Sequence, residues 1–130
     1  MIFSYEYNGR FSPAMPVIPV SFSPVDDENG LIGEFDAVID SGADGTLIPI
    51  TFLKRVGAEK LDKVHMIGIA GHGVWVDIFL VTMWVGPIKL NGMRVIANPA
   101  DEIILGRNVL NQLRITLDGP AEVTELVLSP

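Results

Sequence analysis

The chain has 130 residues, of which 48% are hydrophobic and 19% charged, which is enough for one domain that buries a core without metal or disulfide support. It contains no cysteine, and this excludes disulfides, thiolate zinc sites and cysteine nucleophiles. The formal net charge of -7 disfavours contact with phosphate backbones and anionic membranes, so we expect no nucleic-acid partner and no membrane partner.

The segment from Met1 to Tyr7 lacks the basic flank and long apolar run of a signal peptide. The longest apolar stretch, residues 78–85, is far shorter than the roughly 20 residues that a membrane-spanning helix needs. We therefore expect a soluble, cytoplasmic protein in which residues 1–130 form a single domain.

Runs of β-branched and aromatic residues alternate with Gly, Pro and Asn along the chain, which is typical of an all-β domain. The first hairpin is predicted from strands at 17–22 and 31–39, joined by a turn that ends in Asn29-Gly30. Pro19 places the first of these strands at an edge or against an irregular partner, because proline cannot donate to a ladder. Residues 47–56 are ambiguous, because residues 49–56 could form a short helix with Pro49 in its first turn and Gly57 at its end.

A long hairpin with a glycine-rich tip is predicted around Gly71-His72-Gly73, and Gly86-Pro87 ends it. A further hairpin is expected around Asn91-Gly92. One short helix is expected over 108–113, where apolar residues recur at helical spacing behind a possible Asn cap. The remaining strands are expected over residues 64–70, 74–85, 88–96, 103–105, 115–117 and 123–128.

The most informative motif is Asp40-Ser41-Gly42, which follows the apolar run 35–39, so that a strand delivers an acid into a tight turn. Acid–base chemistry by aspartates needs two carboxylates, and the motif occurs once. The other candidate, Asp118, has Gly119 where a hydroxyl is required and Pro120 directly after it, so we interpret it as a turn residue. A second Asp40, from a second copy of the chain, is the partner we expect.

The segment Leu105-Gly106-Arg107-Asn108 follows the Asp40-Ser41-Gly42-Ala43 segment in the same order and at similar spacing as two motifs of the retropepsins. Over about Pro16 to Leu117 the chain therefore resembles these single-domain aspartic proteases of retroviruses and their cellular and bacterial relatives. The resemblance implies an all-β, closed barrel with one short C-terminal helix. It also implies a homodimeric aspartic endopeptidase that cleaves extended peptide or protein substrates and needs no cofactor.

The resemblance assigns roles to matching positions. Asp40 would be the catalytic acid, the Ser41 hydroxyl would bond the main chain of the facing loop, and Gly42 would offer its carbonyl to bound peptide. Arg107 would pair with Asp44 and support the loop. The full set of implied site residues is Asp40, Ser41, Gly42, Ala43 and Asp44 in the loop, Gly106, Arg107 and Asn108 as support, and Ile67, Gly68, Ile69, Ala70 and Gly71 in a flap over the substrate, with Ile48, Val76 and Ile104 as pocket residues.

Two departures from the retropepsin pattern concern the dimer. Viral relatives have an arginine just before the first strand that reaches across the dimer, whereas Ala14-Met15-Pro16 occupies that stretch here and Arg10 lies too early. We expect residues 1–15 and 121–130 to be terminal dimerisation or extension segments.

No metal site is predicted, because His65 and His72 lack a third ligand. The alternative function is a catalytically silent peptide-binding or oligomerisation module with the same fold.

Overall fold

The computed structural model describes residues 1–67 and 71–129. Its elements in chain order are β1 (Ile2–Glu6), β2 (Val17–Ser23), η1 (Glu28–Gly30), β3 (Ile32–Ile39), β4 (Thr46–Pro49), α1 (Ile50–Val56), β5 (Glu59–Ile67), β6 (Gly73–Val85), β7 (Ile88–Asn98), β8 (Ile103–Leu105), α2 (Arg107–Leu110), β9 (Ile115–Asp118) and β10 (Val123–Val127).

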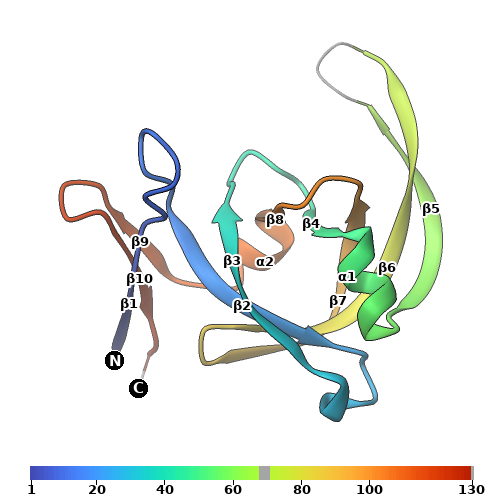
Figure 1. The fold of residues 1–130 in the computed structure, drawn as a ribbon, viewed down its shortest axis with the longest axis horizontal. Coiled ribbons are helices and arrows are strands. Elements are labelled where there is room, and N and C mark those ends of the chain that lie inside the picture. The colour runs from blue at the N-terminus through green and yellow to red at the C-terminus, as the bar shows by residue number, and fades with distance from the viewer. Residues whose placement is uncertain (68–70, 130) are drawn as a thin grey trace.

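Six of these strands form a closed ring (Figure 1). The order is β2-β3-β8-β4-β7-β6, and β6 pairs with β2 to close it. The β3–β8 and β4–β7 pairs are parallel, and the other pairs of the ring are antiparallel. The ring confirms the predicted all-β closed barrel.

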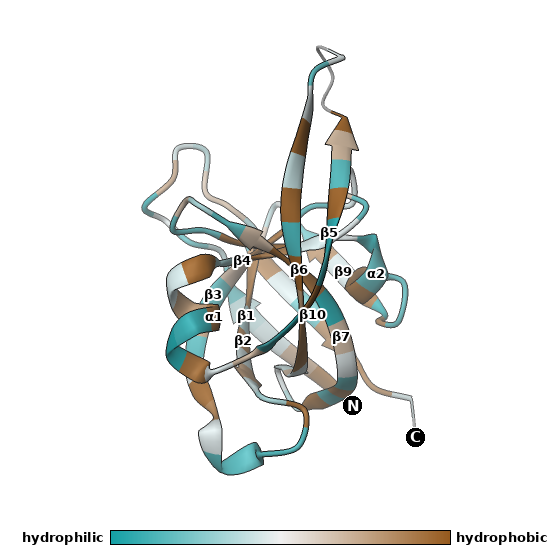
Figure 2. Cartoon of the chain, turned by 90° about the vertical axis from the view of Figure 1, so that its right-hand side faces the viewer, coloured by the Kyte–Doolittle hydropathy of each residue, from teal (hydrophilic) through white to brown (hydrophobic). Residues whose placement is uncertain are grey.

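Two features of the chain lie outside the ring. Strand β5 pairs with β6 alone and forms a long hairpin that projects beyond the barrel, with hydrophobic and hydrophilic residues alternating along it (Figure 2). Strands β1, β10 and β9 form a separate antiparallel sheet. Here the two ends of the chain meet, since the Met1 amino group donates to the Leu128 carbonyl oxygen over 3.1 Å.

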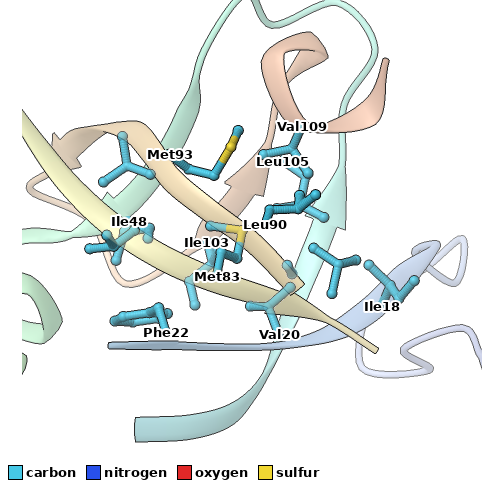
Figure 3. Close-up of a cluster of buried hydrophobic side chains, with 14 of the residues drawn as sticks. Ile18, Val20, Phe22, Ile48, Met83, Leu90, Met93, Ile103, Leu105 and Val109 are labelled. Atoms are coloured by element: carbon cyan, nitrogen blue, oxygen red, sulfur yellow. The ribbon is translucent and has the colours of Figure 1, made fainter. Parts of the chain in front are cut away.

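The barrel is filled by apolar side chains that alternate along its strands. On β2, Ile18, Val20 and Phe22 are fully buried, and on β6 the same holds for Val81 and Met83 (Figure 3). Burying a side chain of this size contributes about 1.5–3 kcal/mol, so the ring supplies most of the hydrophobic stabilisation. Phe35 and Phe52 pack against this core and stack on each other with ring centroids 4.5 Å apart.

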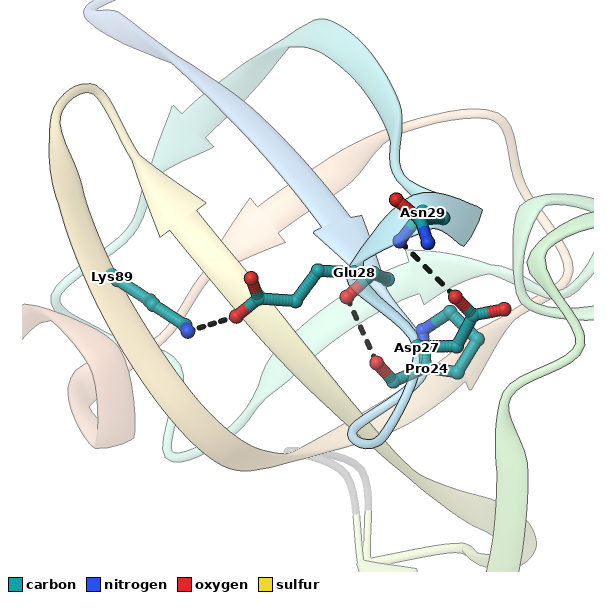
Figure 4. A network of polar contacts seen from close by, with 6 residues as sticks. Pro24, Asp27, Glu28, Asn29 and Lys89 are labelled. Carbon is teal, nitrogen blue, oxygen red and sulfur yellow. Dashed lines mark hydrogen bonds and ion pairs between the residues drawn. The ribbon is translucent and has the colours of Figure 1, made fainter.

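The first predicted hairpin is confirmed, and its turn is held by polar contacts (Figure 4). The Asp27 carboxylate accepts a hydrogen bond from the Asn29 backbone N–H over 3.1 Å, and Glu28 forms an ion pair with Lys89 of β7. Strand β2 is not an edge strand, since it pairs with β3 and β6. Pro19 lies just before the stretch that pairs with β6, and its carbonyl oxygen accepts a hydrogen bond from the Gly86 N–H over 2.9 Å. The ambiguous segment 47–56 divides into the end of β4 and the helix α1, which begins at Ile50 and is capped by Gly57 with a left-handed φ of 75°.

The predicted hairpin around Asn91-Gly92 is wrong. Strand β7 runs through both residues, and the register of its pairing with β6 shifts here, so Gly92, with φ 60°, serves a bulge. The chain reverses instead between Val85 and Ile88, at the point where Gly86 has φ 52°. Two further differences are an unpredicted strand, β1, and a C-terminal helix α2 that is shorter than expected.

Candidate active site

Strand β3 carries Asp40 to one end of the barrel. Its last residue, Ile39, pairs in parallel with Leu105 of β8, and the Asp40 backbone N–H donates to the Leu105 carbonyl oxygen over 3.1 Å. The loop 40–45 and the residues after Leu105 therefore leave the barrel side by side. Parallel pairing is what brings the two sequence motifs together.

The loop holds the Asp40 carboxylate in a defined position. Its Oδ1 atom accepts a hydrogen bond from the Gly42 N–H over 2.9 Å, and the Asp40 carbonyl oxygen accepts one from the Ala43 N–H over 3.2 Å. Asp40 is half-buried, whereas Ser41 and Gly42 are exposed. The chain thus presents one carboxylate on a turn at its surface.

Arg107 fastens this loop to the start of α2. Its backbone N–H donates to the Ala43 carbonyl oxygen over 2.8 Å. Its guanidinium donates through Nη1 to the Ser41 carbonyl oxygen over 2.8 Å and through Nη2 to the Asp44 carboxylate. One arginine therefore fixes the loop at three places.

Position 106 requires glycine for steric reasons and not because of its backbone conformation. Its φ of -91° is open to any residue, but a Cβ atom there would lie 2.1 Å from the Gly45 carbonyl oxygen and 3.0 Å from that of Ala43. The two backbone segments are therefore in direct contact, and a side chain between them would separate the loop from α2.

Thr46 has a structural role that the sequence analysis did not assign. Its buried hydroxyl donates to Oδ1 of Asn108 over 2.8 Å and accepts from the Gly106 N–H over 3.1 Å. Asn108 in turn donates through Nδ2 to the Arg94 carbonyl oxygen over 3.0 Å. The sequence feature that could have indicated this role is a hydroxyl residue at position 46, directly after the loop and before the apolar residues Leu47 and Ile48.

An open groove of about 520 Å³ lies between the β5–β6 hairpin and the barrel. It is lined by Ile50, Lys63, Val74, Trp75, Val76, Asp77, Ala97 and Pro99. Val76 was expected in such a pocket. Ile48 was expected there too, and this is wrong: its side chain is 0% exposed and belongs to the core, whereas Leu47 and Ile104, which pair across the strands, are half-buried.

The hairpin itself is described except at its tip. Of the five residues expected to form a flap, Ile67 ends β5 and is exposed, Gly71 has φ 79°, and Gly68, Ile69 and Ala70 lie outside the described residues. Trp75 is 69% exposed, and its ring lies 5.2 Å from that of His65. The hairpin therefore offers apolar and aromatic surface near the groove.

Other sequence-based expectations concern Asp118, metal sites and membrane-spanning helices. Asp118, predicted in a turn, is the last residue of β9, and its Oδ1 atom accepts from the Ala121 N–H over 3.1 Å across the turn to β10. Within residues 1–67 and 71–129, no three His, Asp or Glu side chains are grouped as a metal site. In the same residues no helix is long and apolar enough to cross a membrane.

A closed barrel that ends in an Asp-Ser-Gly loop, fastened by a Gly-Arg-Asn segment, defines a retropepsin-like chain. A family model described as "gag-polyprotein putative aspartyl protease" matches residues 29–112, which include both motifs. The chain belongs to this family.

Solved structures of aspartic proteases share the fold. A retropepsin-like aspartic protease from Rickettsia conorii is 13% identical, with a TM-score of 0.67 over 97% of this chain and 91% of that one. EIAV protease in complex with the inhibitor HBY-793 is 20% identical, with a TM-score of 0.58 over 75% of this chain and 86% of that one. No curated protein matches the sequence.

Proposed function

We propose that the protein is a homodimeric aspartic endopeptidase with one Asp40 from each subunit in a shared active site. The observation that carries the proposal is the Asp40 loop. It presents a single carboxylate at the surface and is fastened from behind by Arg107, Gly106 and, through them, the buried Thr46 hydroxyl. A carboxylate that is held in one position by several hydrogen bonds of its loop is preorganised, as catalysis requires.

The chemistry follows from placing two such carboxylates within hydrogen-bonding distance. Like charges at that distance do not both ionise cheaply, so the pair holds one proton between them. The ionised Asp40 takes a proton from a water molecule, whose oxygen attacks the peptide carbonyl carbon, while the protonated Asp40 donates to the carbonyl oxygen. Return of a proton to the amide nitrogen breaks the C–N bond and releases an amine and a carboxylic acid.

The substrate is an extended peptide that lies between the Asp40 loop and the β5–β6 hairpin, which acts as a flap. A strand-like peptide is recognised by main-chain hydrogen bonds, with alternate side chains in pockets. The groove beside Val76 and Trp75 is suited to an apolar or aromatic side chain, because Ile50, Ala97 and Pro99 complete its wall.

The test is Asp40→Asn, which keeps the Oδ1 acceptor for the Gly42 N–H but removes the acid. We expect it to lower kcat/KM on a peptide library by at least about 10³-fold with an unchanged melting temperature, since the homodimer loses both acid–base groups and each contributes about 10²–10⁴-fold. Asp26→Asn, at an exposed acid in the β2–β3 turn, is the matched control and retains activity. A wild-type dimer that cleaves no member of a broad library at any pH between 3 and 8 would favour the silent binding module.

A further inference from the structure

Strand β9 has a free edge. Among the described residues it pairs with β10 only. The Arg114 carbonyl oxygen accepts a hydrogen bond from the Val127 N–H over 2.9 Å, so the backbone groups of Arg114, Thr116 and Asp118 face β10. Because these groups alternate in direction along an antiparallel strand, those of Ile115 and Leu117 face outward and can pair with another strand.

The free edge runs beside an apolar pocket that reaches the Asp40 loop. Ile115 and Leu117 pair with the buried residues Leu126 and Thr124, so their side chains lie on the face of the sheet turned toward the barrel. Leu117 is nonetheless 49% exposed. A pocket of about 260 Å³ is lined by Ile39, Ser41, Leu110, Leu113, Ile115 and Leu117.

The sequence of β9 with the residue before it, Arg-Ile-Thr-Leu-Asp, complements itself in antiparallel pairing. With a two-fold axis at Thr116, Arg114 lies opposite Asp118 of the partner subunit, and Ile115 lies opposite Leu117 of the partner subunit. The apolar pair falls on the inner face and the charged pair on the outer one. A two-fold axis forms both pairs twice.

We infer that β9 pairs with β9 of a second copy about an axis at Thr116, which joins the two terminal sheets and seats Leu117 of the partner subunit beside Ile115 at the pocket. Ile115 and Leu117 then exchange backbone hydrogen bonds with the facing strand. The inference rests on the proposed function, which needs a second Asp40, and Ser41 in the pocket wall links the interface to that site. Residues 1–15 and 121–130 were expected to be dimerisation or extension segments. In this interface they support β9 through β1 and β10 and do not themselves contact the partner subunit.

Cross-linking tests the register, since the chain has no cysteine of its own. Thr116 would face its counterpart at a non-hydrogen-bonded position, where Cα atoms are about 4.5 Å apart, within the range of a disulfide. We expect Thr116→Cys to form a covalent dimer on mild oxidation. Arg114→Cys alone is the control that stays uncoupled, because four residues, roughly 13 Å, separate the two copies of position 114. Mixed with Asp118→Cys, it cross-links.

Sedimentation over a concentration series tests the charge pairing. Arg114→Asp and Asp118→Arg should each raise the dimer dissociation constant roughly tenfold or more, because both charged pairs become repulsive. An equimolar mixture of the two variants should recover the wild-type value by forming a heterodimer with both pairs restored. Asp118→Asn controls for the turn, since it keeps an acceptor for the Ala121 N–H.

The outcomes separate this inference from the proposed function, because neither readout uses a substrate. Cross-linking through position 117 in place of 116, or a mixture no tighter than its components, overturns the β9 register. An active enzyme whose Thr116→Cys variant does not cross-link overturns the interface and leaves the peptidase standing. A dimer that cross-links at 116 without cleaving any peptide supports the interface and contradicts the peptidase.

Discussion

Gly106→Ala is the change that tests most directly how the Asp40 loop is held. The added Cβ would meet the Gly45 carbonyl group, with the oxygen at 2.1 Å and the carbon at 2.4 Å. Backbone must therefore move, which places the cost at the upper end of the 1–3 kcal/mol usual for overpacking. The movement also weakens the 2.8 Å hydrogen bond from the Arg107 N–H to Ala43, worth about 1 kcal/mol. We expect a loss of about 3–4 kcal/mol, or a melting temperature lower by about 10–15 °C.

Calorimetry and urea denaturation measure this loss, and Gly9→Ala is the matched control. A Cβ at Gly9 meets nothing within 4 Å, so this variant should keep the wild-type stability or gain slightly through a less flexible unfolded state. If Gly106→Ala melted within about 2 °C of Gly9→Ala, the contact between the two backbone segments would not be the constraint that we infer. Activity should fall with stability at Gly106, because the same movement displaces the loop.

Three further changes test separate parts of the structure. Thr46→Val should lower the free energy of unfolding, measured by urea denaturation, by about 2 kcal/mol, because it leaves the Gly106 N–H and the Asn108 side chain without their partner. Thr124→Val should be neutral or stabilising, since the Thr124 hydroxyl is buried without a partner among the described residues. Equal losses of stability in the two variants would contradict this role of Thr46. Burial, and then the charge of Glu34, raises the pKa of Tyr5 above 10.0, so the folded state favours the neutral phenol. This contribution is complete below pH 10 and is lost as pH rises through the folded-state pKa, so wild type should lose stability at pH 11 more steeply than Tyr5→Phe. Arg107→Lys should change stability by less than about 1 kcal/mol, as its ion pair is exposed, but lower kcat/KM at least tenfold; parallel losses would assign Arg107 a role in stability alone.

Local patterns in the sequence predicted most strands, because alternation and turn residues act over a few positions. They failed where a local signal has two uses. Asn91-Gly92 is a strong turn signal, but the residues around it pair with β6, and Gly92 serves a bulge. The start of β5, from Glu59 to Lys63, was missed because charged residues hide a strand that is exposed along its length. In β1, the alternation of Phe3 and Tyr5 with polar residues could have been recognised.

The candidate site was predictable to a different degree. Paired motifs made Asp40 and Arg107 candidates, but the sequence does not show that β3 and β8 run parallel, and this pairing is what makes the two segments neighbours. Long-range pairing is set by the closure of the whole ring and not by any local preference. For the same reason Ile48 was assigned to a pocket, since its hydrophobicity does not reveal which face of β4 it occupies.

Closure of the ring also decides which parts of the chain can receive a partner. Each of the six barrel strands has neighbours on both sides, so their edges are already paired. Among the described residues, the strands that keep a free edge along their length are β5, β1 and β9. Strand β5 belongs to the hairpin beside the groove, and β9 lies beside the pocket that contains Ser41. Closure of the ring therefore confines free strand edges to the hairpin and the terminal sheet, and the homodimer that we propose would use the edge of β9.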